Sequence, residues 1–158
     1  MTESGDAAEI VERATRAGLT LTTAESCTGG MVSAAITDIA GSSAVFERGF
    51  VTYSNIAKTE MIGVAPATLD AHGAVSEEVA REMAIGARGA ARADLAVSIT
   101  GIAGPGGSEF KPEGRVCFGL ATPEGTQTET IEFGALGRAQ VRRAARDHAL
   151  GLLLRALG

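Results

Sequence analysis

The sequence has few of the residues that build metal centres and disulfide frameworks. It contains two cysteines and two histidines in 158 residues. Cys27 and Cys117 show no metal-ligand spacing and are too few for a disulfide framework. His72 and His148 lie far apart with no carboxylate cluster, so we expect no zinc site. Reduced thiols are the simplest interpretation, and they favour a cytoplasmic location.

The chain also lacks the composition of a nucleic-acid-binding protein. Tryptophan is absent, aromatic residues make up 4%, and the formal net charge is −5. Nucleic-acid-binding proteins usually present a basic face with stacking aromatic side chains. We therefore expect no nucleic-acid partner, although a local basic pocket for one phosphate is compatible with this balance.

No hydrophobic run is long enough to cross a membrane. The most apolar stretch, ALGLLLRALG at residues 149–158, contains Arg155 and falls short of the roughly 20 residues that a spanning helix needs. The first ten residues, MTESGDAAEI, are polar and acidic, unlike a signal peptide. We expect a cytoplasmic protein with no membrane partner.

The pattern that is present indicates one globular domain over residues 1–158. Hydrophobic residues make up 45% and charged residues 21%, as in soluble globular proteins. Apolar periodicity alternates between helical and extended segments and ends in a hairpin and a helix, which predicts an α/β domain with a mixed sheet. The predicted helices include 6–17, 28–39, one starting at Ser76 and 136–156, and the predicted strands are 19–24, 45–53, 94–100, 115–122 and 128–133.

The first candidate site is Thr-Ala-Glu-Ser-Cys-Thr-Gly-Gly at residues 23–30, a turn from a strand into a helix. Ser26 would lie near the helix N-terminus, where backbone N–H groups favour developing negative charge. Gly29 and Gly30 allow another group to approach the backbone. The alternative, which the local sequence alone favours, is that Ser26 or Thr28 only caps the helix. Cys27 is a second potential nucleophile, but no histidine lies in these motifs to activate it.

The second candidate is Val-Thr-Tyr-Ser-Asn-Ile-Ala-Lys at residues 51–58, where a strand leads into a helix. Ser54 and Lys58 are four residues apart, which does not match the three-residue Ser–Lys spacing of penicillin-binding proteins. Lys58 can instead reach Ser26 from a neighbouring element. A lysine base needs a pKa near 7–8 rather than about 10.4, a shift that burial beside Tyr53 and apolar residues can supply. The alternative is an ordinary solvated lysine.

The third candidate is the glycine-rich segment 100–107, Thr-Gly-Ile-Ala-Gly-Pro-Gly-Gly, after a predicted buried strand. Its backbone N–H groups can cradle a phosphate or a carboxamide, yet it has neither the Walker Gly-Lys-Ser/Thr nor a Rossmann context. An ordinary flexible connection is equally compatible. Arg138 and Arg142, one helical turn apart, can clamp a phosphate or simply form a solvated face.

Together these segments resemble the CinA C-terminal domain family over about residues 7–154. The resemblance rests on the motif at 23–30, on Gly-Phe-Val-Thr-Tyr-Ser-Asn-x-x-Lys at 49–58, on His-Gly-Ala-Val-Ser at 72–76 and on Gly-Ile-Ala-Gly-Pro at 101–105. It implies a three-layer α/β/α sandwich, a homodimer, and hydrolysis of nicotinamide mononucleotide to nicotinate mononucleotide and ammonia, without metal or organic cofactor. It also implies a site of Ser26, Lys58 and Tyr53.

The resemblance further implies the residues that bind substrate. These are Thr28, Gly29, Gly30, Thr100, Gly101, Gly104 and, for the ribose phosphate, Arg142.

Two segments depart from the family pattern. The loop after Pro105 is shortened, and Glu113 stands where the family has an apolar residue. The Gly-Asp-Arg-Glu stretch before the last helix is Leu-Gly-Arg-Ala at 136–139. Two other functions are compatible with the chain: a non-catalytic nucleotide-binding module and a competence-associated interaction protein.

Overall fold

The computed structural model describes residues 3–108 and 110–158, and its centre is a mixed five-stranded sheet. The strands are β1 (Leu21–Glu25), β2 (Phe50–Val51), β3 (Leu95–Gly101), β4 (Arg115–Thr122) and β5 (Gly125–Glu132). They are ordered β2-β1-β3-β4-β5, with β1 parallel to both of its neighbours and the β4–β5 hairpin antiparallel. β1 therefore separates β2 at one edge from β3, β4 and β5, and the strand order reverses at this position.

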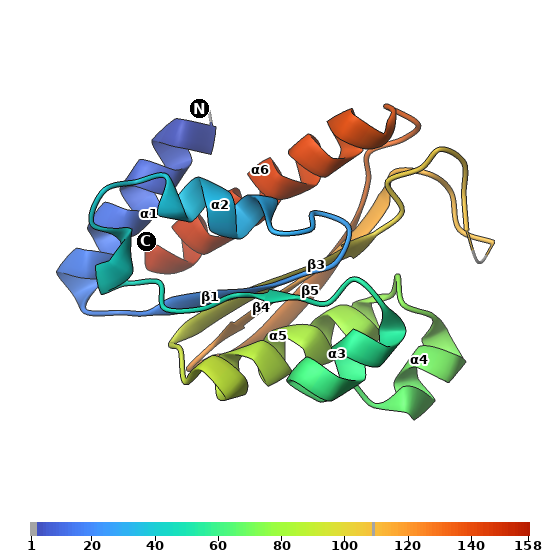
Figure 1. The fold of residues 1–158 in the computed structure, drawn as a ribbon, viewed down its shortest axis with the longest axis horizontal. Coiled ribbons are helices and arrows are strands. Elements are labelled where there is room, and N and C mark those ends of the chain that lie inside the picture. Colours follow the sequence, from blue (N-terminus) through green and yellow to red (C-terminus); the bar gives the residue numbers. More distant parts are fainter. Residues whose placement is uncertain (1–2, 109) are drawn as a thin grey trace.

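Helices cover both faces of the sheet, so the predicted three-layer α/β/α arrangement is confirmed (Figure 1). Their bounds are α1 Glu3–Ala17, α2 Met31–Thr37, α3 Asn55–Ile62, α4 Pro66–His72, α5 Glu77–Ala91 and α6 Arg138–Leu157. In Figure 1, α1, α2 and α6 lie above the sheet and α3, α4 and α5 lie below it. Within the described residues, no helix combines the length and the apolar character needed to span a membrane.

The sheet is buried between two apolar clusters because helices pack on both of its faces. Six of the seven residues of β3 are buried, the pattern of a central strand covered on both sides. One cluster joins α1, α2 and α6 to the sheet, and Ile10, Ile36 and Leu153 are among its fully buried members. The other joins α5 to the opposite face through Val79 and Met83. This packing holds the ends of the central strands in fixed positions.

The structure confirms the predicted hairpin and the predicted start of α5, although β5 begins at Gly125 rather than at residue 128. Two other segments differ from the prediction. The strand predicted over 45–53 is reduced to Phe50–Val51, because Phe46 forms only an isolated bridge to Leu21 and the residues between Phe46 and Phe50 are irregular. The helix predicted over 28–39 is shorter, at Met31–Thr37, because the residues before it form the turn that carries Ser26.

A pH-dependent contribution to stability is expected from Glu77, the first residue of α5. Its carboxylate accepts hydrogen bonds from the hydroxyls of Thr130 (2.7 Å) and Thr128 (2.8 Å) on β5. These bonds, Thr130 first, lower the pKa of Glu77. A carboxyl group with a lowered pKa stabilises the fold above its unfolded pKa, and this contribution is lost as the pH falls through its folded pKa.

We therefore expect Glu77→Gln to lower the free energy of unfolding at pH 7 by about 1 kcal/mol, a small effect because solvent screens this carboxylate. The loss should shrink toward pH 3, as urea unfolding at the two pH values will show. Glu78→Gln, in the same helical turn, is the control and should show a weaker pH dependence. An equal loss for Glu77→Gln at both pH values would contradict the assignment.

Candidate active site

The candidate residues gather where the parallel strands β1, β2 and β3 end. Ser26 follows β1 directly, Tyr53 comes two residues after β2, and Gly101 is the last residue of β3. In open α/β sheets, ligands bind outside the carboxyl ends of the strands at the point where the strand order reverses. A cavity of about 350 Å³ lies here, and Ser26, Tyr53 and Lys58 all line it.

The centre of this cavity is a contact between Ser26 and Lys58. The Lys58 Nζ donates to Ser26 Oγ at 3.1 Å and to the Thr52 carbonyl at 2.9 Å. Lys58 is 1% exposed and Ser26 is 8% exposed. The lysine reaches this position because Ser54 caps α3, accepting a hydrogen bond from the Ala57 N–H at 3.0 Å. The two residues, which are distant in the sequence, are thus within hydrogen-bonding distance.

A buried carboxylate fixes the turn that carries Ser26. Glu25 is fully buried, and its carboxylate accepts hydrogen bonds from the backbone N–H groups of Val32 and Ser33, both at 2.9 Å, and from the Ser33 hydroxyl at 2.8 Å. It therefore satisfies N–H groups at the start of α2, where Gly30 provides no side-chain cap. Sequence reasoning missed this role, although an acidic residue at the end of a buried strand before a helix is a detectable signal.

Arg142 also holds this turn, through two of its backbone carbonyl groups. Its guanidinium donates to the carbonyl oxygens of Cys27 (3.0 Å) and Thr28 (3.3 Å). Gly29 has a positive φ of 57°, and a Cβ there would lie 3.3 Å from the Arg142 Nη2. The group that approaches the backbone at Gly29 is thus this arginine. The Thr28 hydroxyl is buried without a hydrogen-bond partner among the described residues.

A second arginine, Arg138, lines the cavity itself. Its guanidinium donates to the Tyr53 hydroxyl at 2.6 Å and to the Gly104 carbonyl at 2.7 Å. Tyr53 is 59% exposed, so its ring forms part of the cavity rim. The guanidinium of Arg138, unlike that of Arg142, lies at the mouth of the cavity. Helical spacing predicted only that the two arginines lie one turn apart, and the family resemblance chose Arg142 for the phosphate, so neither singled out Arg138 as the arginine that lines the cavity.

The glycine-rich segment forms the remaining wall of the cavity. Thr100, Gly101 and Gly104 all line it, and the Thr100 hydroxyl donates to the Ala74 carbonyl at 2.8 Å. Among residues 3–108 and 110–158, no group of three or more histidine, cysteine, aspartate or glutamate side chains is arranged to hold a metal ion. The polar side chains that line the cavity include the Ser26 hydroxyl, the Lys58 amine and the Arg138 guanidinium.

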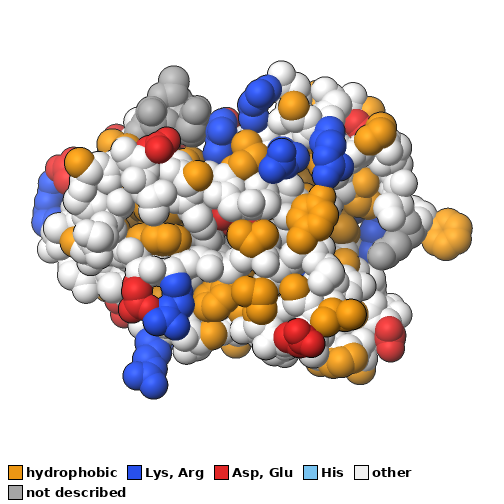
Figure 2. All heavy atoms as spheres, viewed as in Figure 1, with side chains coloured by type: hydrophobic (Ala, Val, Ile, Leu, Met, Phe, Trp, Pro, Cys, Tyr) orange, Lys and Arg blue, Asp and Glu red, His pale blue; other side chains and the backbone are white. Residues whose placement is uncertain are grey.

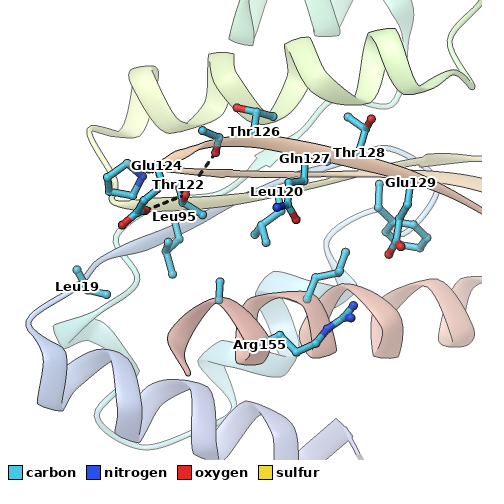
Figure 3. Close-up of a pocket in the computed structure, with 16 residues that line it drawn as sticks. Leu19, Leu95, Leu120, Thr122, Glu124, Thr126, Gln127, Thr128, Glu129 and Arg155 are labelled. Atoms are coloured by element: carbon cyan, nitrogen blue, oxygen red, sulfur yellow. Dashed lines mark hydrogen bonds between the residues drawn. The ribbon is translucent and has the colours of Figure 1, made fainter.

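A larger cavity of about 760 Å³ lies elsewhere, between the β4–β5 hairpin and the end of α6 (Figure 3). Leucine side chains such as Leu95 and Leu120 line it together with Arg155 and Gln127. Neither Ser26 nor Lys58 is among its lining residues. Its size therefore does not make it the better candidate for hydrolytic chemistry.

Cys27 is adjacent to Ser26, but its environment opposes a nucleophilic role. Burial raises the pKa of Cys27 to about 12, and the thiolate is the reactive form. At pH 8 only about one thiol in ten thousand would be ionised.

We expect iodoacetamide to label Cys27 in the folded protein at least about a thousandfold more slowly than in the protein unfolded in urea. Peptide mass spectrometry of a labelling time course measures this, and rapid labelling of the native thiol would contradict it.

The fold and the site define an α/β protein with a buried serine–lysine pair at the carboxyl edge of a mixed sheet. A family model described as the CinA C-terminal domain matches residues 4–157. The chain belongs to this family.

Named relatives and solved structures agree with this membership. A protein named nicotinamide-nucleotide amidohydrolase PncC, from Escherichia coli (strain K12), is 64% identical over 137 residues, which cover 86% of this chain and 83% of the relative. The structure of the competence/damage inducible protein CihA from Agrobacterium tumefaciens has a TM-score of 0.94 at 46% identity and covers 98% of this chain and 94% of its own. A Klebsiella pneumoniae competence damage-inducible protein A (ComA) has a TM-score of 0.96 at 37% identity, covering 99% of this chain and 98% of its own.

Proposed function

We propose that this protein hydrolyses the carboxamide of nicotinamide mononucleotide, releasing ammonia and nicotinate mononucleotide, with Ser26 as the nucleophile. The observation that carries the proposal is the 3.1 Å contact between Lys58 Nζ and Ser26 Oγ inside a cavity. A serine hydroxyl is weakly nucleophilic unless a neighbouring base accepts its proton. The nicotinamide-nucleotide amidohydrolase name of the Escherichia coli relative supports the choice of substrate.

In the first half of the reaction, Ser26 Oγ attacks the carboxamide carbon. Lys58, as a neutral amine, accepts the hydroxyl proton and transfers it to the leaving nitrogen, so that the C–N bond breaks and ammonia departs. Lys58 is 1% exposed, so this proton transfer takes place away from bulk water. The product of this half is an ester between Ser26 and the nicotinate group.

Backbone N–H groups of the turn after Ser26 are the proposed donors to the oxyanion that forms during attack. The carbonyl oxygens of Cys27 and Thr28 are held by Arg142 on one side, which fixes the orientation of these peptide groups. Donors that are fixed in advance stabilise developing charge without reorganisation in the transition state.

In the second half of the reaction, a water molecule gives a proton to Lys58 and attacks the ester, and Ser26 Oγ regains a proton as it leaves.

Arg138 is the cation that we assign to the ribose phosphate, because its guanidinium lies at the cavity mouth. Lys and Arg side chains gather near the start of α6 in the upper part of Figure 2, although the net charge of the chain is −5. A local positive region of this kind attracts a phosphate monoester.

Two further roles stay predictions from the family resemblance: that of Arg142 at the phosphate and that of Tyr53 as a proton relay. The homodimer is proposed on the same footing. The single domain over residues 1–158, the cytoplasmic location and the absence of a nucleic-acid partner are proposed from length, composition and charge.

The deciding experiment measures ammonia released from three related compounds by the purified chain. Nicotinamide mononucleotide should be hydrolysed well, nicotinamide riboside poorly and free nicotinamide least, since each step removes groups that the cavity binds. No ammonia from the mononucleotide would overturn the proposal. Tight binding of the mononucleotide without turnover would instead favour a nucleotide-binding module.

A further inference from the structure

A single carboxylate, that of Glu113, connects the cavity loop to the start of α6. Its Oε1 accepts a hydrogen bond from the Gly106 N–H at 2.7 Å, and its Oε2 accepts one from the Gly137 N–H at 3.2 Å. Gly106 lines the cavity, and Gly137 immediately precedes Arg138, the first residue of α6. Glu113 thus bridges two segments that lie next to each other only in the folded chain.

The turn at Gly104 is shaped around this carboxylate. Gly104 has a positive φ of 92°, and a Cβ at this position would lie 2.5 Å from the Glu113 carboxyl carbon. The Glu113 carboxylate thus packs directly against the Gly104 backbone, in the space that a side chain at this position would take. This close contact means that the position of Glu113 and the path of the cavity loop depend on each other.

Arg138 also holds the turn at 104–106, through a backbone carbonyl group of that turn. Its guanidinium donates to the Gly104 carbonyl at 2.7 Å, while the Glu113 carboxylate accepts from Gly106. The turn is therefore held by an anion at one end and a cation at the other. The cation also donates to the Tyr53 hydroxyl at the cavity rim.

The start of α6 has an N–H group that needs an acceptor from elsewhere in the chain. Gly137 is the N-cap residue and has no side-chain cap. A carboxylate near the first turn of a helix satisfies its N–H groups and interacts favourably with the helix dipole. Glu113 supplies that acceptor from the loop between β3 and β4, which fixes the backbone next to Arg138.

We propose that Glu113 is a positioning residue that sets the place of Arg138 and of the turn 104–106 for the phosphate-bearing end of the substrate. This inference rests on the proposed function for the identity of the substrate. Glu113 acts through Gly106 and Gly137 and is not among the residues that line the cavity.

The negative charge of Glu113 alone would have the opposite effect on binding. A carboxylate near a phosphate site repels the phosphate, so removal of the charge would lower KM. Positioning and repulsion are therefore separated by comparing two variants. Glu113→Gln removes the charge and keeps one acceptor oxygen, whereas Glu113→Val removes the charge and both acceptors.

The kinetic test compares these variants with Glu124→Val, which removes a carboxylate from the turn between β4 and β5. Glu113→Val should raise KM for nicotinamide mononucleotide about tenfold and change kcat less than about twofold, with Glu113→Gln between it and the parent. Glu124→Val should leave both constants unchanged. A KM that is unchanged or lower in both Glu113 variants overturns the inference, as does a fall in kcat at constant KM.

A second measurement does not depend on amide hydrolysis. Titration calorimetry with ribose 5-phosphate as the probe should show an affinity about tenfold weaker in Glu113→Val than in Glu124→Val. Amide hydrogen exchange at Gly106 and Gly137 should also become faster in Glu113→Val, since both N–H groups lose their acceptor. Unchanged affinity for the probe overturns the inference even if exchange becomes faster. If the parent chain releases no ammonia from nicotinamide mononucleotide, only the proposed function is overturned.

Discussion

Ser26→Ala is expected to lower kcat for ammonia release by at least about a thousandfold, because it removes the atom that forms the acyl bond. Substrate binding should change little, since the substitution removes a single oxygen from the cavity wall. Ser42→Ala is a matched control, because Ser42 is also 8% exposed but lies in the 3₁₀ helix at Ser42–Ala44. Steady-state kinetics and thermal unfolding of both variants separate a catalytic from a structural loss. Activity near that of the parent in Ser26→Ala would contradict the nucleophile assignment.

A trapping experiment shows whether Ser26 forms a covalent intermediate or only orients water. Hydroxylamine competes with water for an acyl-enzyme and converts the acyl group to a hydroxamate, with Ser26 leaving as the hydroxyl. We expect the parent chain to form the hydroxamate and Ser26→Ala to form none above background. Ammonia release by the parent with no hydroxamate at saturating hydroxylamine would contradict the covalent step and leave Ser26 with an orienting role.

The serine–lysine contact could be predicted from motifs but not from periodicity. Periodicity placed Ser26 after a strand and Lys58 on a helix, each with an ordinary structural alternative. The contact depends on β1 and β2 being adjacent and parallel, which brings their carboxyl ends together. Strand order is a property of long-range packing, so local residue patterns cannot specify it. The family resemblance supplied that missing information.

The structure divides the two candidate arginines by their acceptors rather than by their spacing. Arg138 and Arg142 are one helical turn apart, and either could have faced a phosphate. Arg142 is held by the carbonyls of Cys27 and Thr28, whereas Arg138 lines the cavity. Which guanidinium donates to backbone carbonyl groups depends on how α6 packs against the turn after Ser26. No sequence pattern specifies that packing.

The two departures from the family pattern meet in the folded chain. Glu113 lies in the first departing segment, and Gly137 lies in the second. A hydrogen bond of 3.2 Å now joins the Gly137 N–H to the Glu113 carboxylate. The sequence showed each change separately, and only the fold shows that the carboxylate of one segment serves the helix start in the other.

Lys58→Met is expected to lower kcat by about a thousandfold, within the range for loss of a general base. Methionine has a similar length and no charge, so it fills the space of a side chain that is only 1% exposed. Lys58→Arg should not restore activity, because a guanidinium stays protonated and cannot accept the Ser26 proton. Glu60→Met, on the same helix and exposed to solvent, is the control for damage to α3. Activity in Lys58→Met within about tenfold of the parent would contradict the base assignment.

Rescue by a small amine distinguishes proton transfer from simple packing at this position. Lys58→Ala leaves a cavity beside Ser26, and methylamine can enter it and accept the hydroxyl proton. Ammonia release by this variant should therefore rise with the concentration of neutral methylamine, and so with pH at fixed total amine. A packing role predicts equal rescue at every pH, because methylammonium fills the same volume. An amine that restores activity only in its neutral form would thus identify Lys58 as the group that takes the proton from Ser26.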